Sequence, residues 1–263
     1  MFVASSGWHG VDTPPAGPSI HQGPDRERDL SSLALLAERT RPVSSSQTRL
    51  IPVLAPLAEL LPDGALRRGS TILVTGSSAA GASSEGGGDI SLALALLAAA
   101  SVAGSWCALV GVDDLGAVAA HDMGIDLGRL AVVPRPGAAW AETASLLLGG
   151  VDLVVLRPPF RPRPAMARKL VARTRERRSV LVIVAGRSGW PDPPDIRLSV
   201  DDLRWEGAGS GEGYLSGRLM TLTATGRRAS ARPRRHHLWL PSAAGTVAGA
   251  DGDDGITDTV VPA

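Results

Sequence analysis

Lysine is almost missing from this sequence, since Lys169 is the only lysine among 27 basic residues. A site that needs a lysine to neutralise phosphate would therefore have to include Lys169. Cysteine also occurs once, at Cys107, which excludes a disulfide within the chain and a zinc site built from several cysteines. Aromatic residues make up 3% of the chain, so few rings are available to stack on nucleic acid bases.

Long apolar runs are also lacking. The longest, from Ile90 to Ala103, is too short to span a bilayer. The N-terminus has no basic region followed by an apolar core, so we expect no export signal. With 44% hydrophobic residues and one cysteine, the composition favours a soluble cytoplasmic protein with one sizeable core and no membrane association.

The stretch Thr71–Ser101 organises the rest of the chain. Thr71–Thr75 favours a strand, small and glycine residues follow it, and an apolar segment long enough for a helix begins at Asp89. Strand, glycine-rich turn and helix make up a P-loop, in which turn amides cradle phosphates, a lysine neutralises them and a hydroxyl holds Mg²⁺. The scaffold of a nucleotide site is therefore predicted here.

The residues of this turn lack the chemistry of a working P-loop. Gly76 and Gly81 have the required spacing, but Ala82 stands where lysine is required, before Ser83. Alignment on the helix instead puts Asp89 in the lysine position, where a carboxylate would repel phosphate. Asp89 is more simply interpreted as the N-cap of the helix. We expect a degenerate nucleotide site that holds no cofactor.

Beyond this unit, strands and helices alternate. We expect strands at 106–111, 130–133, 151–156 and 180–185, and helices near 114–123, 138–148 and 164–177. After Trp190 the pattern changes to strands joined by Gly- or Arg-rich turns, at 196–205, 214–225 and 236–240. The predicted fold class is α/β, with a mostly parallel sheet, helices on both faces and an antiparallel extension at one edge.

Four regions are predicted along the chain. Residues 1–28 are expected to be disordered, 29–47 to hold a short helix and linker, 48–241 to form the core and 242–263 to be a disordered acidic tail. A second short helix is expected at 53–61, before a turn at 66–70. The apolar face of the first helix is the candidate partner-binding surface; it consists of Leu30, Leu33, Ala34 and Ala37. Such a helix packs on its own core or docks on a neighbour.

The other catalytic groups of a P-loop ATPase are missing as well. A Walker B strand is an apolar run ending in a metal-binding Asp, whereas Val151–Leu156 ends in Arg157 and carries Asp152 at the opposite end. Asp113 follows a strand and could orient a water molecule, although a helix N-cap is the favoured interpretation. We therefore expect no enzymatic activity.

Two segments resemble RecA. LPDGALRRGSTILVTG is similar to the lead-in to its P-loop, and residues 107–156 are similar to its core: a strand, an acidic turn, a helix ending in a Gly-hydrophobic-Asp turn, a strand and a Walker B strand opening with Val-Asp. The similarity covers roughly residues 48–205. A RecA-like core without catalytic residues is similar to the ImuA-type (ImuA′) accessory proteins of the bacterial mutasome.

This resemblance implies a function in DNA damage repair. It implies an adaptor of damage-induced (SOS) translesion synthesis and mutagenesis that binds an ImuB-like homologue of Y-family polymerases. RecA and an error-prone replicative-type polymerase are further implied partners. The implied location is the cytoplasm, in association with the nucleoid.

Basic residues form two clusters, at Arg157–Arg178 and Arg227–His237. In the first, Ala167, Leu170, Val171 and Thr174 form the inward stripe of a helix. The candidate DNA-contacting residues are those expected to point outward and two from the second cluster: Arg168, Lys169, Arg173, Arg177, Arg234 and Arg235. A solvated face and a phosphate-contacting surface are both compatible with this pattern.

Three functional hypotheses follow from the sequence. The favoured one is a non-catalytic RecA-like adaptor that binds proteins. The second is an atypical RecA-family ATPase that uses Ser83 or Ser84. The third is a protein that binds DNA weakly and electrostatically through its arginines.

Overall fold

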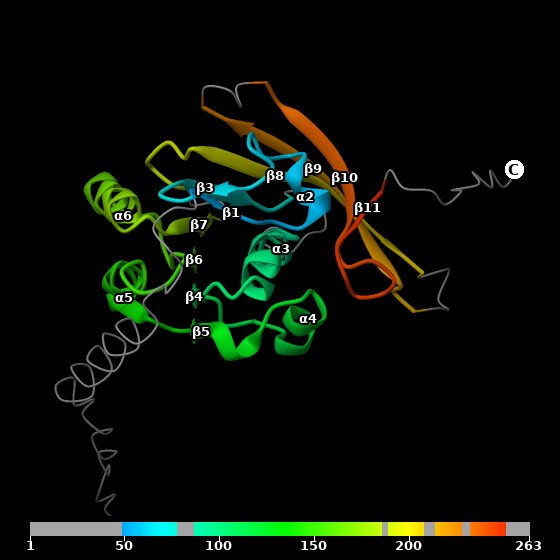
Figure 1. Ribbon diagram of the computed structural model, residues 1–263, viewed down its shortest axis with the longest axis horizontal. Coiled ribbons are helices and arrows are strands. Elements are labelled where there is room, and N and C mark those ends of the chain that lie inside the picture. Colours follow the sequence, from blue (N-terminus) through cyan, green and yellow to red (C-terminus); the bar gives the residue numbers. More distant parts are fainter. Residues whose placement is uncertain (1–48, 78–86, 186–188, 208–213, 228–231, 251–263) are drawn as a thin grey trace, which may run out of the picture.

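One nine-stranded sheet organises the computed structural model, which describes residues 49–77, 87–185, 189–207, 214–227 and 232–250. The strand order in this sheet is β11-β10-β9-β8-β3-β7-β6-β4-β5 (Figure 1). The six strands from β8 to β5 are all parallel; they are β3 (Thr71–Thr75), β4 (Cys107–Val110), β5 (Leu130–Val133), β6 (Leu153–Leu156), β7 (Val180–Val184) and β8 (Ile196–Glu206). The prediction of a large, mostly parallel α/β sheet is confirmed.

Helices cover both faces of the parallel strands (Figure 1). On one face, α3 (Asp89–Val102) and α4 (Ala117–Asp122) contribute to the larger core cluster. On the other, α5 (Trp140–Leu147) and α6 (Pro164–Arg177) pack in the second cluster. Short 3-10 turns, η1 (Leu127–Arg129) and η2 (Gly137–Ala139), precede β5 and α5. The arrangement buries both faces of the central strands, which explains their continuous apolar runs.

Helix α3 is apolar around its whole circumference. Ten of its 14 residues are buried, because it lies in the same core cluster as the parallel strands and as apolar residues of the later strands such as Met220 and Leu238. A helix enclosed in this way needs no polar face. The segment LALALLAAA therefore reflects burial within the core.

The antiparallel extension lies at one edge of the sheet, as the sequence predicts. β9 (Gly217–Gly226) pairs with β8 and with β10 (Arg234–Trp239), and β10 pairs with β11 (Ala248–Gly249). The first residues of the tail predicted over 242–263 are therefore part of the fold, because the sheet continues to Gly249, and residues 251–263 lie outside the described residues.

A small two-stranded sheet precedes β3. β1 (Leu50–Ile51) pairs with β2 (Leu66–Arg67), where the sequence suggested only a linker and a turn. Between them, α2 (Ala55–Ala58) is shorter than the helix expected over 53–61. Strands of two residues carry no usable periodicity, so sequence patterns miss them. The predicted N-terminal helix with Leu30, Leu33, Ala34 and Ala37 lies outside the described residues.

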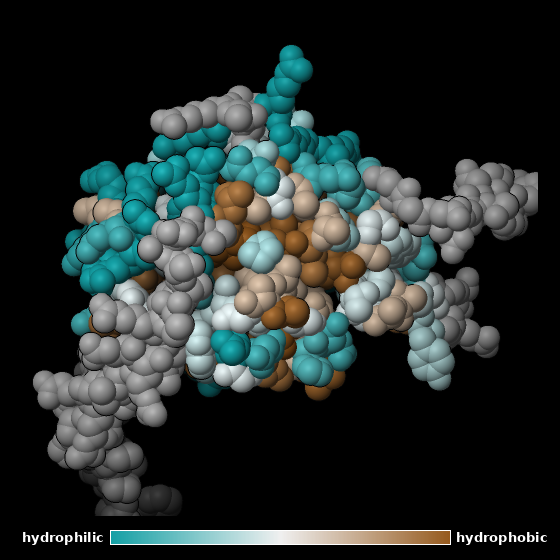
Figure 2. Space-filling view, viewed as in Figure 1, coloured by the Kyte–Doolittle hydropathy of each residue, from teal (hydrophilic) through white to brown (hydrophobic). Residues whose placement is uncertain are grey.

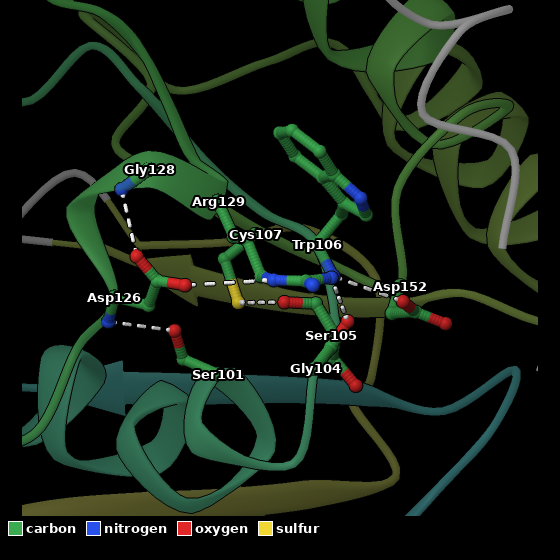
Figure 3. Close-up of polar contacts among 9 residues, drawn as sticks. All are labelled: Ser101, Gly104, Ser105, Trp106, Cys107, Asp126, Gly128, Arg129 and Asp152. Carbon is green, nitrogen blue, oxygen red and sulfur yellow. Dashed lines mark hydrogen bonds and ion pairs between the residues drawn. The ribbon is translucent and has the colours of Figure 1, made fainter.

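Asp152 joins several strands at their amino ends. It is 2% exposed, and its Oδ1 accepts from Arg68 Nη1 at 2.7 Å. Its Oδ2 accepts from the backbone N–H of Trp106 at 3.1 Å, as Figure 3 shows. Its backbone carbonyl accepts from Val180 N at 2.8 Å. The expectation that Asp152 lies at the end of its strand away from any Walker B position is confirmed.

The single cysteine lies beside this carboxylate. Burial, with a further contribution from the negative charge of Asp152, raises the pKa of the Cys107 thiol to about 12. At neutral pH the thiol is therefore protonated and is a core residue, since the thiolate is the reactive form. Nearby, the Asp126 N–H donates to Ser101 Oγ and Arg129 Nη1 donates to the carbonyl of Gly104 (Figure 3).

We predict that Asp152→Ala lowers the free energy of unfolding by about 3–5 kcal/mol, because it leaves the Arg68 guanidinium without its buried partner. Asp63→Ala is the matched control, since Asp63 pairs with Arg67 through side chains that are 37% and 68% exposed. This exposed pair should contribute less than about 1 kcal/mol. Urea denaturation of both variants measures the difference, and equal destabilisation would contradict the structural role of Asp152.

Candidate functional site

The candidate site lies at the carboxyl ends of the parallel strands. Gly76 follows β3, and Ser77 pairs with Gly87 through two backbone hydrogen bonds of 3.1 and 3.3 Å, which close the base of the segment between them. The predicted P-loop positions Gly81, Ala82 and Ser83 lie outside the described residues. The described part of the site therefore consists of the base of this turn, the start of α3 and the ends of neighbouring strands.

The end of the turn is packed against the antiparallel extension. Gly88 has φ +85°, and a Cβ added to it would lie 2.6 Å from the Met220 methyl carbon. A Cβ on Gly87 would lie 2.6 Å from a methyl carbon of Leu203. A side chain at either position would require Leu203 or Met220 to shift, and the positive φ of Gly88 favours glycine there in addition. The space directly beside the start of α3 is occupied by protein.

Asp89 is the first residue of α3 and is 5% exposed. Its position differs from the prediction, because Gly88 occupies the N-cap and the Asp89 Oδ1 accepts from the N–H of Ile90 at 2.8 Å. The N-terminus of a helix attracts anions through its free N–H groups and its dipole. In this chain a carboxylate of the protein itself lies where a phosphate would be attracted.

The charge of Asp89 is only partly compensated. Burial raises the pKa of its carboxyl group, while the hydrogen bond from Ile90 N and the positive charge of Arg157 act in the opposite direction, and Asp114 raises the pKa further. Burial lowers the pKa of the Arg218 guanidinium, and the negative charge of Asp89 opposes this effect in part. Asp89, Arg157 and Arg218 thus form an electrostatically coupled group, here called the internal charge cluster.

Arg157 follows β6 at the Walker B position. Its Nη1 lies 3.2 Å from Asp114 Oδ1, and its backbone N–H donates to the carbonyl of Val110 at 2.9 Å. Gly111, with φ +80°, ends β4 so close to the Arg157 carbonyl that any Cβ at this position would clash with it. A cation, instead of a metal-binding carboxylate, therefore occupies this end of the strand.

Arg218 is the residue of this cluster that the sequence analysis missed. It comes from β9, its Nε donates to the Leu240 carbonyl at 2.7 Å, and its guanidinium lies 5.1 Å from the centre of the Trp205 ring. Its charge acts on Asp89 because β9 packs in the same core cluster as α3. No local pattern around Arg218 indicates this, since the interaction joins a strand and a helix that are far apart in sequence.

Asp113 is not the helix N-cap favoured on sequence grounds. The helix after it, α4, begins at Ala117 with Gly116 at the N-cap, so Asp113 is not a cap. Its Oδ2 lies 3.6 Å from Arg135 Nε in an exposed ion pair. Such a pair contributes little to stability.

The candidate DNA-contacting residues on α6 are mostly placed as predicted. Ala167, Leu170, Val171 and Thr174 are buried, while Arg168, Lys169 and Arg177 are exposed. The surface over α6 is hydrophilic (Figure 2).

Two arginines differ from the expectation of an outward position. The Arg173 side chain is 29% exposed, lies beside Gly149 and is 3.5 Å from Glu176. From β10, Arg234 Nη1 donates to the carbonyls of Glu59 and Leu61, at 3.1 and 2.8 Å. Arg235 is exposed. Arg173 and Arg234 therefore have structural contacts, which leaves Arg168, Lys169, Arg177 and Arg235 for a ligand.

The part of the chain that the structure describes contains neither a candidate metal site nor a candidate membrane span. No group of three or more His, Cys, Asp or Glu side chains there could hold a metal ion. None of the helices described is long and apolar enough to cross a membrane.

Comparison with known proteins places this core in a family. The family model described as the MT3502 N-terminal domain matches residues 59–192. This stretch runs from the end of α2 to the loop before β8 and includes α3 and Arg157. The uncharacterized protein Rv3395c of Mycobacterium tuberculosis is 44% identical over 97 residues, which are 36% of this chain and 48% of that protein. The match thus spans about half the length of this curated relative.

We predict that Asp89→Asn raises the free energy of unfolding at neutral pH. The amide oxygen of Asn can still accept from Ile90 N, while the cost of burying a charge is removed. Because the pKa of Asp89 is higher in the folded protein than its ordinary 3.8, this cost is present above the folded-state pKa and is lost as the pH falls toward 3.8. The stabilisation by Asn should therefore shrink on acidification.

Denaturation of wild type and variant between about pH 4 and pH 8 measures this change. Asp113→Asn is the control, because Asp113 is half exposed in a surface ion pair and its replacement should change stability by less than about 1 kcal/mol. A lower stability of Asp89→Asn at neutral pH would mean that Arg157 and Arg218 outweigh the cost of burial.

Proposed function

This chain belongs to the MT3502 N-terminal domain family, and on that premise we propose that it is a non-catalytic, RecA-like adaptor in a damage-induced translesion DNA synthesis complex. Its proposed direct partner is an ImuB-like homologue of Y-family polymerases. RecA and an error-prone replicative-type polymerase are further proposed members of the complex. The proposed location is the cytoplasm, in association with the nucleoid.

The observation that carries the non-catalytic part of the proposal is the internal charge cluster. A P-loop ATPase needs cations around the phosphates and a carboxylate at the end of the Walker B strand to hold Mg²⁺. Here Asp89 lies at the start of the helix and Arg157 lies at the end of β6, so the two charges are exchanged. A nucleotide would meet repulsion at the first position, and Mg²⁺ would meet it at the second.

The adaptor part of the proposal is supported by the order of elements. Strand β4, an acidic turn, α4, a Gly124-Ile125-Asp126 turn, β5 and then β6 after Val151-Asp152 follow one another as in the RecA-like pattern of the sequence. A RecA-like scaffold that neither binds nor hydrolyses nucleotide can act only by binding other molecules through its surface. Binding of other proteins is the function that such a scaffold supports best.

The proposed partner-binding element is the predicted helix with Leu30, Leu33, Ala34 and Ala37, which lies outside the described residues. A helix of this length is marginal in water by itself, so burial of its apolar face must stabilise it. Docking of this face on the polymerase homologue is the proposal, and packing on the chain's own core is the alternative.

The first prediction of this proposal is that the protein neither hydrolyses ATP nor melts at a higher temperature with ATP and Mg²⁺. If the Kd for ATP were micromolar, millimolar ATP would be at about a thousand times the Kd and would stabilise the folded state by about 4 kcal/mol. Differential scanning fluorimetry would detect such a change easily, with a working P-loop ATPase as the positive control.

An upward shift of the melting temperature that requires Mg²⁺ would contradict the proposal. ATP turnover that disappears in Asp113→Ala would favour the atypical ATPase instead. Asp113 is suited to this test because it is exposed and its ion pair with Arg135 contributes little to folding.

The second prediction concerns partner capture. Deletion of residues 1–41 should abolish capture of the polymerase homologue and leave the melting temperature nearly unchanged, because the core begins beyond the deleted segment. Deletion of residues 1–28 is the matched control, since it keeps the predicted helix and should retain capture. Affinity pull-down with purified ImuB-like protein measures both. Normal capture by the longer deletion, or a marked fall of its melting temperature, would overturn this assignment.

A further inference from the structure

A cavity of about 590 Å³ lies at the amino end of β3, the opposite end of this strand from Gly76. Residues from three separated parts of the chain form its wall. They are the turn before β3 with Arg67, Arg68 and Ser70, the end of α6 with Arg175, and the segments around β8 and β9 with Asp195 and Arg227. We call this cavity the arginine pocket.

The pocket contains more positive than negative charge. Four arginines and two carboxylates line it, and Arg68 is already committed to the buried Asp152. Asp195 is also engaged, because its Oδ2 accepts from the N–H and the Oγ1 of Thr71 at 2.9 and 3.0 Å.

Arg67 pairs with the other lining carboxylate, Asp63, at 2.9 Å, and the two remaining arginines are weakly engaged. The Arg175 Nη2 is 3.9 Å from Asp195 Oδ1, which is near the limit of an ion pair, and the Arg175 side chain is 56% exposed. Arg227 is exposed, and within the described residues its side chain has no ion pair. Two guanidinium groups can therefore turn toward a ligand without breaking a buried contact.

The wall also contains a buried hydroxyl without a partner. Ser70 is 7% exposed, and its Oγ has no hydrogen-bond partner among the described residues. Buried hydroxyls are nearly always hydrogen-bonded, to protein or to a bound group. Ser70 is therefore a polar residue of the wall whose hydroxyl the described protein atoms leave without a partner.

The lining residues restrict the kind of ligand. Paired guanidinium groups match the oxygens of phosphate, to which arginine donates two parallel hydrogen bonds. None of the lining residues is aromatic, so the pocket offers no ring on which a base could stack. The wall thus suits a phosphate group and lacks the features that would recognise a nucleotide base.

Outside the pocket, Arg168 provides a second exposed positive charge on α6. Arg168 and Arg175 are seven residues apart on this helix, both are exposed, and exposed Ala172 lies between them. Residues seven apart lie on the same helix face, about 10 Å from each other. Two arginines at this spacing suit a ligand that carries successive phosphates.

We propose that the arginine pocket binds a backbone phosphate of nucleic acid, with Arg175 and Arg227 as the principal contacts. The site is separate from the degenerate nucleotide site, which lies at the other end of β3, and it does not depend on the adaptor function. It unites one arginine from each of the two basic clusters of the sequence with the turn before β3.

The test compares two double charge reversals of equal net charge. Arg175→Glu with Arg227→Glu alters the pocket, and Arg135→Glu with Arg204→Glu is the matched control, because these side chains are 83% and 77% exposed and lie outside the pocket. Fluorescence anisotropy of a labelled single-stranded oligonucleotide, measured over a range of salt concentrations, gives the affinity and its salt dependence. Melting temperatures verify that all proteins are folded.

We expect the pocket variant to bind about tenfold more weakly than the control variant at low salt. Loss of two phosphate contacts should also reduce the slope of log K against log salt by about 1.4, at about 0.7 per contact for single strands. Equal weakening in both variants would overturn the proposal, because net charge alone would then explain binding. Failure of the wild type to bind the oligonucleotide would overturn it as well.

A second experiment distinguishes the source of the phosphate. Pyrophosphate and a mononucleotide are each titrated into the wild type and the pocket variant while the melting temperature is followed. We expect weak or no stabilisation by either, because neither extends along α6. Strong stabilisation that is lost in the pocket variant, without oligonucleotide binding, would overturn the assignment to nucleic acid in favour of a free phosphate ligand.

Discussion

The parallel sheet depends on one buried carboxylate at its amino ends. Asp152 accepts hydrogen bonds from Arg68 and from the backbone of Trp106, while its own backbone pairs with β4 and with the start of β7. It thereby connects the turn before β3 with three strands. A buried charge tolerates no loss of its partners, so this residue constrains the relative positions of all four segments.

The same constraint explains why β6 resembles a Walker B strand and lacks its chemistry. Its acidic residue serves the architecture at the amino end, and the carboxyl end carries Arg157 close to Asp114 and coupled to Asp89. At the carboxyl end of β6, the positive charge of Arg157 therefore compensates carboxylates of the protein itself instead of the phosphates of a ligand. The non-catalytic part of the proposed function rests on that internal compensation.

The two ends of β3 therefore have opposite electrostatic character. Its carboxyl end adjoins a buried carboxylate that would repel phosphate, whereas its amino end opens on a pocket with an excess of arginine. In the proposed adaptor, the end of β3 that receives phosphate in a P-loop protein has a structural role. The proposed phosphate contact lies at the opposite end of the same strand.

The sequence by itself determined the elements whose signals are local. Helix α6 has the predicted bounds and the predicted inward residues, such as Leu170 and Thr174, because a 3.6-residue period reports which side chains face the core. The tertiary structure alone decided that Arg218 is coupled to Asp89, and that Arg175 and Arg227 line one pocket with Arg67. These tertiary interactions depend on the order of strands in the sheet, and no short stretch of sequence encodes that order.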